Sequence, residues 1–392
     1  MNKTLSYISI WACILIAGMG CSEQPVPTVQ SSIDLNTAMS GDTTGYERAI
    51  GVRDLTFPDD FGPHPSFKTE WWYFTGNVDD EEGRRFGYEL TLFRSALSPD
   101  RVQEDLSDSS LLVGADSGWS SSQLYMGHFS LANVDGFATN EDPAFYAFER
   151  FGRGAKGLAG AQATPFRVWL DHWSADGSGD GLFPIRVRAE KDGIAIDLTL
   201  SSSKPIVLQG DKGFDQKGAG VGNASYYYSF TRMNTEGTIR INDQSTSVTG
   251  YSWKDHEWST SALDDNQEGW DWFALQLSDN REIMFYVIRE SGGSMGAFTN
   301  GTLVEADGTT TSLKKEDVLL EVTDTWKSPH SGATYPSGWV LQVPAYGIDL
   351  AIQPLLKDQE LNVSVRYWEG AVSIDGKNGL TGRGYVELTG YR

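Results

Sequence analysis

Two segments of the sequence combine ionisable side chains with tryptophans, and this combination suits acid-base chemistry. The first segment is Glu70-Trp71-Trp72-Tyr73. The second segment is Trp253-Lys254-Asp255-His256-Glu257-Trp258. A carboxylic acid packed among indole rings loses hydration, which raises its pKa and lets it remain a proton donor near neutral pH. The two segments therefore indicate a functional pocket.

A third segment of the same kind follows closely and reads Gly269-Trp270-Asp271-Trp272-Phe273. Side chains alternate between the two faces of a β-strand, so the second segment divides into two sets. One set is Lys254, His256 and Trp258, and the other is Trp253, Asp255 and Glu257. If this strand lines a barrel, either His256 beside Trp258 or the two carboxylates point inward. The sequence leaves both arrangements open.

A structural explanation of these side chains stays open beside the catalytic one. Asp255, Glu257 and Asp271 could pair with basic residues such as Arg281 or cap turns, and His256 could be a hydrogen-bonded core histidine. A metal site needs three or four converging His, Cys, Asp or Glu ligands. The spacing of these residues names no such set, so we expect no metal.

The rest of the sequence, which must position these segments, has the pattern of an all-β protein. Glycines number 43, and almost no stretch has the 3.6-residue apolar period of an amphipathic helix. Alternating segments between turn residues predict strands at residues 88–94, 124–134, 166–173, 185–189, 194–200, 226–231, 270–277, 283–289, 302–304, 319–322, 339–343, 348–352, 361–367 and 385–388. Two such sets predict two barrels or sandwiches. We place the boundary in the turn-rich stretch 235–245, which gives domains at residues 51–238 and 239–392.

The N-terminus has the features of an export signal. Lys3 precedes an apolar stretch at residues 8–17, which is followed by Gly18-Met19-Gly20-Cys21. This pattern predicts a lipobox with cleavage and lipidation at Cys21, or else an ordinary signal cleaved nearby. The polar residues 22–50 would then be a flexible tether. These features predict a lipid-anchored protein of the bacterial cell envelope, held in the outer membrane and facing the periplasm, with the exterior orientation left open by the sequence.

The charge of the chain limits its partners. It has 31 basic and 53 acidic residues, a net charge of −22, and no basic stripe. Such a field repels phosphate backbones, so nucleic acid is not an expected partner. Residues 152–157 match the glycine-rich motif of dinucleotide-binding proteins, but no helix-forming run follows them. We therefore expect no nucleotide or other cofactor. The sequence leaves the oligomeric state open.

Several longer motifs together resemble the AttH-like and carotenoid 1,2-hydratase (hydroxyneurosporene synthase) superfamily. Besides the three segments above, these motifs are His64-Pro65 and residues 74–77, 150–162, 367–370 and 384–391. The resemblance implies two lipocalin-like antiparallel β-barrel domains packed together, with a pocket near their interface. Members of the superfamily include hydratases, cyclases and secreted proteins described as hydrolases, so the fold alone does not settle the chemistry.

For the hydratase members, the resemblance implies addition of water to an isolated alkene without a redox cofactor. An acid must protonate one carbon, the resulting cation must be stabilised, and water must attack it. Transferred to this chain, Asp255 or Asp271 is the expected proton donor, with His256 and Glu257 orienting groups or accepting protons. Tryptophan faces can stabilise a carbocation. The expected ligand-binding residues are Glu70, Trp71, Trp72, Tyr73, Trp253, Trp258, Trp270 and Trp272.

Three functions remain open at this point. The first is an acid-base enzyme that hydrates, isomerises or cyclises a lipid- or terpenoid-like molecule, and the second is a non-catalytic lipocalin-like carrier of such a molecule. The third is a hydrolase, with either Ser294 in Gly292-Gly293-Ser294-Met295-Gly296 or a carboxylate-activated water as nucleophile. A nucleophile elbow needs a helix after the serine, whereas residues 297–301 predict a strand.

Overall fold

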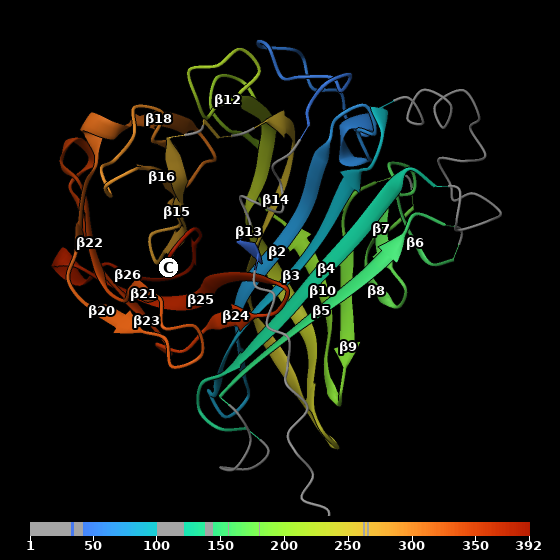
Figure 1. Ribbon diagram of the computed structural model, residues 1–392. Helices are drawn as coiled ribbons and strands as arrows, with labels where there is room; N and C mark the ends of the chain where they lie inside the picture. Colours follow the sequence, from blue (N-terminus) through green and yellow to red (C-terminus); the bar gives the residue numbers. More distant parts are fainter. Residues whose placement is uncertain are drawn as a thin grey trace, which may run out of the picture. The chain divides into compact units, whose positions relative to one another are not determined.

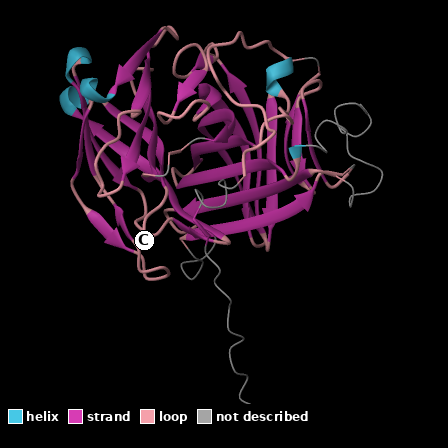
Figure 2. Cartoon of the chain, turned by 45° about the horizontal axis from the view of Figure 1, so that its top comes forward, coloured by secondary structure: helices cyan, strands magenta, loops and turns pink. Residues whose placement is uncertain are grey.

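The computed structural model describes residues 33–34, 42–99, 121–137, 144–155, 157–179, 181–261, 263–264 and 266–392. Within these ranges, the helical segments are single 3-10 turns: η1 (Asp59–Phe61), η2 (Lys315–Asp317), η3 (Pro344–Tyr346) and η4 (Lys377–Gly379). Strands account for most of the remainder (Figure 2). No helix in the described part of the chain is long and apolar enough to cross a bilayer. Cys21 and the expected signal sequence lie outside the described residues.

The first sheet is formed by strands from residue 69 to residue 261. They are β2 (Thr69–Asp80), β3 (Arg85–Ala96), β4 (Gln123–Asn133), β5 (Phe145–Arg153), β6 (Ala159–Gln162), β7 (Arg167–Leu170), β8 (Trp173–Gly177), β9 (Ile185–Lys191), β10 (Ile194–Ser202), β11 (Val207–Leu208), β12 (Phe214–Gln216), β13 (Ala224–Ile241) and β14 (Gln244–Ser261). Their order is β5-β4-β3-β2-β14-β13-β10-β9-β8-β7-β6, with β11 and β12 paired to β13 (Figure 1). Its core contains Trp72, Trp173 and Trp258.

The second sheet is formed almost entirely by the C-terminal part of the chain. Its strands are β15 (Gln267–Leu277), β16 (Glu282–Glu290), β17 (Asn300–Val304), β18 (Thr310–Lys314), β19 (Leu319–Val322), β22 (Trp339–Val343), β23 (Ile348–Pro354), β24 (Glu360–Asn362), β25 (Val365–Gly376) and β26 (Thr381–Leu388), joined by β1 (Ile33–Asp34). A separate two-stranded sheet pairs β20 (Thr325–Lys327) with β21 (Thr334–Pro336). The two large sheets form one nearly closed antiparallel barrel and one half-barrel, which confirms the predicted all-β fold of two packed lipocalin-like barrels.

The passage from the first sheet to the second differs from the expected boundary. The chain crosses between Ser261 and Gln267, whereas a boundary between residues 238 and 239 would cut β13. The turn-rich stretch instead makes the tight hairpin between β13 and β14, with Asn242 at a positive φ of 53°. Polar turn residues occur in hairpins as well as in linkers, so their clustering misplaced the boundary.

Part of the expected tether packs on the folded protein. Residues 42–50 are described and pack on the first sheet, where Ala49 is fully buried and the Tyr46 hydroxyl donates a hydrogen bond of 2.9 Å to the carbonyl of Ala96. Ile33 and Asp34 pair in parallel with Val365 and Arg366 of β25. Prediction of a tether from composition alone therefore missed these anchoring contacts.

Strand β14 brings the first two aromatic and acidic segments together. It pairs with β2 on one side and β13 on the other. The β2 register places Trp72 opposite His256, Tyr73 opposite Asp255, and Trp71 opposite Glu257. Paired residues project to the same face of a sheet, so the two segments form one continuous surface on each face.

The two large sheets contact each other through β2 and β3 of the first and β25 and β26 of the second. A close approach at this interface requires glycine, because a Cβ atom on Gly87 would lie 2.5 Å from the Cβ of Ala371. The amide of Asn77 donates a hydrogen bond of 3.0 Å to the carbonyl of Gly384 across the same interface. The outward face of β2, β3 and β14 therefore borders the second sheet.

Candidate active site

A cavity lies where the outward face of the first sheet meets the second sheet. Its empty space is about 710 Å³, including solvent at the mouth. Apolar and aromatic side chains make up most of its lining, and the acidic groups there are Asp255, Glu257 and Glu387. The full lining is Trp71, Tyr73, Thr91, Phe93, Lys217, Tyr227, Asp255, Glu257, Leu263, Trp270, Trp272, Tyr286, Ile288 and Glu387. Aromatic walls with a few convergent polar groups are typical of sites for small molecules.

Asp255 is held in this cavity by three neutral hydrogen-bond donors. Its carboxylate accepts hydrogen bonds from the Tyr227 hydroxyl at 2.7 Å, the Trp253 indole at 2.7 Å and the Ser229 hydroxyl at 2.5 Å. Burial raises the pKa of Asp255 to about 6, although these hydrogen bonds oppose the rise. Asp255 can therefore hold or release a proton close to neutral pH.

Glu257 lies on the same face but faces a cation. Its Oε1 is 3.3 Å from the ammonium of Lys217, which also lies 2.7 Å from Asp215. Burial raises the pKa of Glu257, and the Lys217 charge opposes this rise. Two neighbouring carboxyls thus have different surroundings: Asp255 meets neutral donors, whereas Glu257 meets an ammonium. Such a difference separates the roles of acid and base in a pair of carboxyls.

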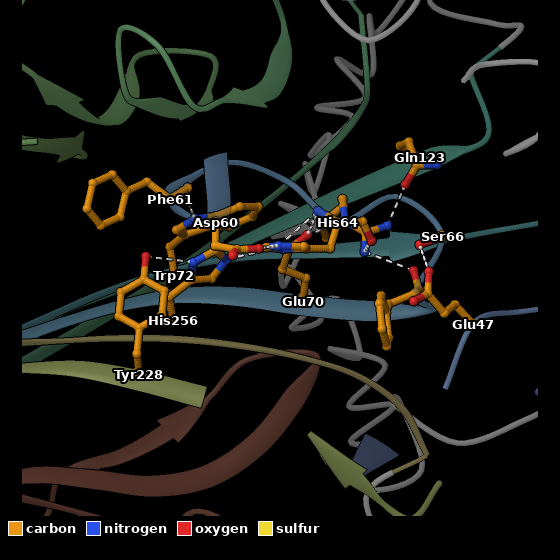
Figure 3. A network of polar contacts seen from close by, with 12 residues as sticks. Glu47, Asp60, Phe61, His64, Ser66, Glu70, Trp72, Gln123, Tyr228 and His256 are labelled. Atoms are coloured by element: carbon orange, nitrogen blue, oxygen red, sulfur yellow. Dashed lines mark hydrogen bonds and ion pairs between the residues drawn. The ribbon is translucent and has the colours of Figure 1, made fainter. Parts of the chain in front are cut away.

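The opposite face of β14 points into the core of the first sheet and builds a different network (Figure 3). Glu70 lies at its centre and accepts from the Nε2 of His256 at 2.8 Å and the Nδ1 of His64 at 2.7 Å. The Nε of Arg94 donates to Glu70 at 2.8 Å. The other nitrogens of His64 and His256 contact Asp60 at 2.8 Å and the Tyr228 hydroxyl at 2.9 Å.

The charges in this network follow from burial and partners. Burial would raise the pKa of Glu70, yet the charges of His64 and Arg94 and the hydrogen bonds from both histidines hold it well below its usual value. Burial would lower the pKa of His64, but Glu70 and Asp60 outweigh it and raise that pKa. Burial lowers the pKa of His256 to about 3. His256 is therefore neutral near pH 7, whereas the carboxylates of Glu70 and Asp60 favour the charged form of His64.

The structure separates the expected site residues into two groups. Trp71, Tyr73, Trp270 and Trp272 line the cavity with Asp255 and Glu257, and Trp253 is buried beside Asp255. The remaining tryptophans, Trp72 and Trp258, lie in the core of the first sheet, stacked on His256 and His64 respectively. The structure thus places the two carboxylates, and not His256 with Trp258, on the cavity face.

Asp271 lies apart from the cavity lining. Its carboxylate faces the guanidinium of Arg289 at 2.9 Å and accepts from the Tyr391 hydroxyl at 3.0 Å. Residues 270 and 272 project to the opposite face of β15, where they line the cavity. This is the structural role that the sequence left open, with Arg289 as the partner in place of Arg281.

His64, Glu70 and His256 have ligand atoms within 4.8 Å of one another, a spacing that could hold a metal ion. These atoms already hydrogen bond to one another, and Glu70 also faces the guanidinium of Arg94. A cation would have to break those hydrogen bonds and lie beside another positive charge, so this donor set does not favour a metal.

Comparison with known proteins identifies the family. The family model described as AttH-like matches residues 48–391. The chain belongs to the AttH-like family. The crystal structure of a protein from Nitrosomonas europaea assigned to AttH has 32% sequence identity and a TM-score of 0.74, and the match covers 88% of this chain and 100% of that one.

Two more distant structures share the fold of this AttH-like chain. Kievitone hydratase from Nectria haematococca has 16% identity and a TM-score of 0.62, with 92% of this chain and 96% of that chain covered. CghA has 14% identity and a TM-score of 0.50, with 89% and 97% covered. Comparison with curated proteins gives no match.

Several side chains of the AttH-like cavity were missed by sequence reasoning. Glu387 accepts a hydrogen bond of 2.6 Å from the indole of Trp270, and burial raises its pKa to about 8. Lys217 and Tyr227 were missed because neither stands next to a tryptophan in the sequence. For Glu387, a signal was present: Tyr385 and Glu387 alternate with apolar residues along a predicted strand.

Proposed function

We propose that this AttH-like protein is an enzyme that binds an apolar or amphipathic small molecule in the cavity and acts on it by cofactor-independent acid-base chemistry. Asp255 is the general acid. The observation that carries this proposal is the position of Asp255, whose carboxyl has a pKa of about 6 and lines a largely aromatic cavity. General acids are most efficient when their pKa lies near the working pH.

Alkene hydration is the reaction that these groups fit best. Asp255 gives its proton to one alkene carbon, the π electrons form the new C–H bond, and the other carbon becomes a cation. The faces of Trp71, Trp270 and Trp272 stabilise that cation. Water attacks it and loses a proton to Glu257, so the product gains one hydrogen and one hydroxyl. Asp255 then regains a proton from solvent and Glu257 releases the proton that it accepted, so both carboxyls return to their starting states.

Two further points bear on the choice of reaction. A neighbour of the same fold is named a hydratase, which agrees with hydration, while isomerisation or cyclisation would begin with the same protonation. Hydrolysis through Ser294 gains no support, because Ser294 is exposed in a turn that leads into the bridge between Arg289 and Met295 rather than into a helix.

The ligand can be found by mass spectrometry of small molecules that co-purify with the protein, and the cavity can be tested with an apolar fluorescent probe. We expect saturable binding, and we expect Trp71→Ala to weaken it about tenfold because the probe loses one aromatic wall. The matched control is Trp326→Ala, since Trp326 packs on Tyr335 outside the cavity lining. Equal probe affinity in the two variants would contradict this placement, and binding without turnover of any co-purified compound would make the protein a carrier.

We also propose that the chain is an exported lipoprotein anchored through Cys21. The support is the apolar stretch at residues 8–17 followed by Gly18-Met19-Gly20-Cys21. Expression in a bacterium fed labelled palmitate should label the wild-type protein and leave Cys21→Ser unlabelled. An unlabelled wild-type protein with a free mature N-terminus would instead indicate an ordinary cleaved signal.

A further inference from the structure

Three glutamates gather where the two sheets meet, next to the cavity. They are Glu89 on β3 and Glu369 and Glu387 on β25 and β26, and we call them the glutamate cluster. Glu369 and Glu387 are paired across their strands, and the charges of Glu89 and Glu387 both act on Glu369. Glu89 and Glu369 are fully buried, whereas Glu387 is partly exposed. Three acids from two sheets thus share one interface.

No cation faces Glu89 or Glu369 among the described residues, in contrast to several other buried acids. Elsewhere in the fold, Glu70 faces Arg94, Glu282 faces Arg232, and Asp271 faces Arg289. Burial raises the pKa of both carboxyls, and the groups that oppose this rise are neutral donors: hydrogen bonds from Thr91 and Ser130 lower the pKa of Glu89, and those from Tyr73 and Tyr367 lower that of Glu369. Burial of an ionised carboxylate without a partner is costly, so such groups either stay protonated or meet a cation.

The polar groups around the cluster are neutral and buried. They are the hydroxyls of Tyr73, Thr91 and Tyr385 and the imidazole of His128, whose Nε2 has no hydrogen-bond partner among the described residues. The Nδ1 of His128 bonds to the Tyr367 hydroxyl at 2.7 Å across the two sheets. Burial lowers the pKa of His128 to about 3, so this imidazole is neutral and supplies no positive charge.

The cluster is continuous with the aromatic cavity. Tyr73, Thr91 and Glu387 belong to the cavity lining, and Thr91 and Glu89 lie two residues apart on the same face of β3. The charges of Asp255 and Glu257 also act on Glu387. The cavity lining therefore joins hydroxyls and a carboxyl of this region to aromatic rings, and the one cation among the described residues of that lining, Lys217, already faces Asp215 and Glu257.

We propose that the glutamate cluster recognises the ammonium group of an amphipathic organic amine whose apolar body lies in the cavity. This inference rests on the proposed function and names the ligand class of the same site. An ammonium group supplies the positive charge and the donors that these carboxyls and hydroxyls accept, and aromatic faces attract the same group. The ammonium group would pair with one ionised glutamate and add no net charge to the cavity. Asp255 can therefore keep its proton and act as the acid.

The raised pKa values in the cluster give the proposal a proton signature. Burial raises the pKa of Glu89 to about 7 and that of Glu387 to about 8. At pH 7, a large share of these carboxyls is protonated, and an arriving ammonium favours their ionised form. Binding of an amine should therefore release a proton, whereas binding of a neutral alcohol should release none.

The test compares octylammonium, 1-octanol and octanoate by calorimetry at pH 7 in two buffers of different ionisation enthalpy. We expect octylammonium to bind about tenfold more tightly than octanol, with octanoate weakest and proton release only for the amine. Glu369→Gln and Glu89→Gln should each reduce the preference for the amine and leave octanol affinity unchanged. The matched control is Glu360→Gln, a buried acid bonded to Ser328, Ser331 and Tyr335 away from the cavity.

Both glutamine variants replace a buried carboxyl that no described cation faces with a neutral side chain of the same shape, so we expect each to fold, as near-ultraviolet circular dichroism can verify. Equal affinity for octylammonium and octanol would overturn the proposal, as would an amine preference that both variants retain. Stabilisation by calcium chloride without any amine preference would assign the cluster to an inorganic cation and also overturn it. Saturable octanol binding in those cases would leave the proposed cavity function intact, whereas no saturable binding of any of the three compounds would remove both.

Discussion

Turnover is expected to fall about 10²- to 10⁴-fold when Asp255 is replaced by asparagine, the usual contribution of a positioned general acid. Asparagine preserves the shape of the side chain and cannot donate a proton to an alkene carbon. The measurement is the steady-state rate on a co-purified compound that the wild-type protein converts. Substrate affinity should change little, because the aromatic walls provide most of the contact.

The pH profile gives an independent check on Asp255. The reaction needs the protonated acid, so kcat/KM should fall about tenfold for each pH unit above the pKa of about 6. The control variant is Asp271→Asn, whose side chain faces Arg289 outside the cavity lining. Its turnover per folded molecule should stay near the wild-type rate. An Asp255→Asn variant with wild-type turnover would refute the assignment of the general acid.

The second large effect is expected for Glu70→Gln and concerns stability. The guanidinium of Arg94, which is 1% exposed, would lose its ionised partner, and breaking a buried pair in this way costs about 3–5 kcal/mol of unfolding free energy. Urea unfolding followed by tryptophan fluorescence measures this loss. Asp197→Asn is the control, because the Arg186–Asp197 pair is exposed and such pairs contribute less than about 1 kcal/mol.

The same network predicts opposite pH dependences for two of its members. His64 has a raised pKa in the folded protein, so its contribution is complete below the unfolded value of about 6.5 and is lost as pH rises through the folded pKa. Glu70 has a lowered pKa, so its contribution is present above the unfolded value and is lost as pH falls. A Glu70→Gln variant as stable as the wild type across this range would show that the network does not hold the fold.

The alternation of residues along strands and the types of residue were enough to predict the all-β fold and part of the candidate site. Alternation correctly divided the segment from Trp253 to Trp258 into two faces, and it placed Asp255 with Glu257. The choice of the cavity face needed the packing of the second sheet, which no local pattern records. The hydrogen bond between Glu70 and His256 could not be predicted either, because these two residues are 186 positions apart in the chain.

The separation of Asp271 from the site has a similar explanation. Its neighbours in the sequence, Trp270 and Trp272, do line the cavity, and Asp271 points the other way because successive residues of a strand alternate. The glutamate cluster was beyond sequence reasoning for a further reason. Glu89 and Glu369 come from strands of different sheets, and nothing near either residue in the chain marks their meeting.

One face of β14 lines the cavity and the other packs in the core of the first sheet, which limits the mutations that this strand can accept. A single residue inserted before Lys254 would slide the following part of the strand by one position and exchange its two faces. Lys254 and His256 would then point into the cavity, while Asp255 and Glu257 would point into the aromatic core of the first sheet. Point substitutions in this strand can alter one compartment alone, but insertions and deletions strike both at once, so its length should be far more constrained than its composition.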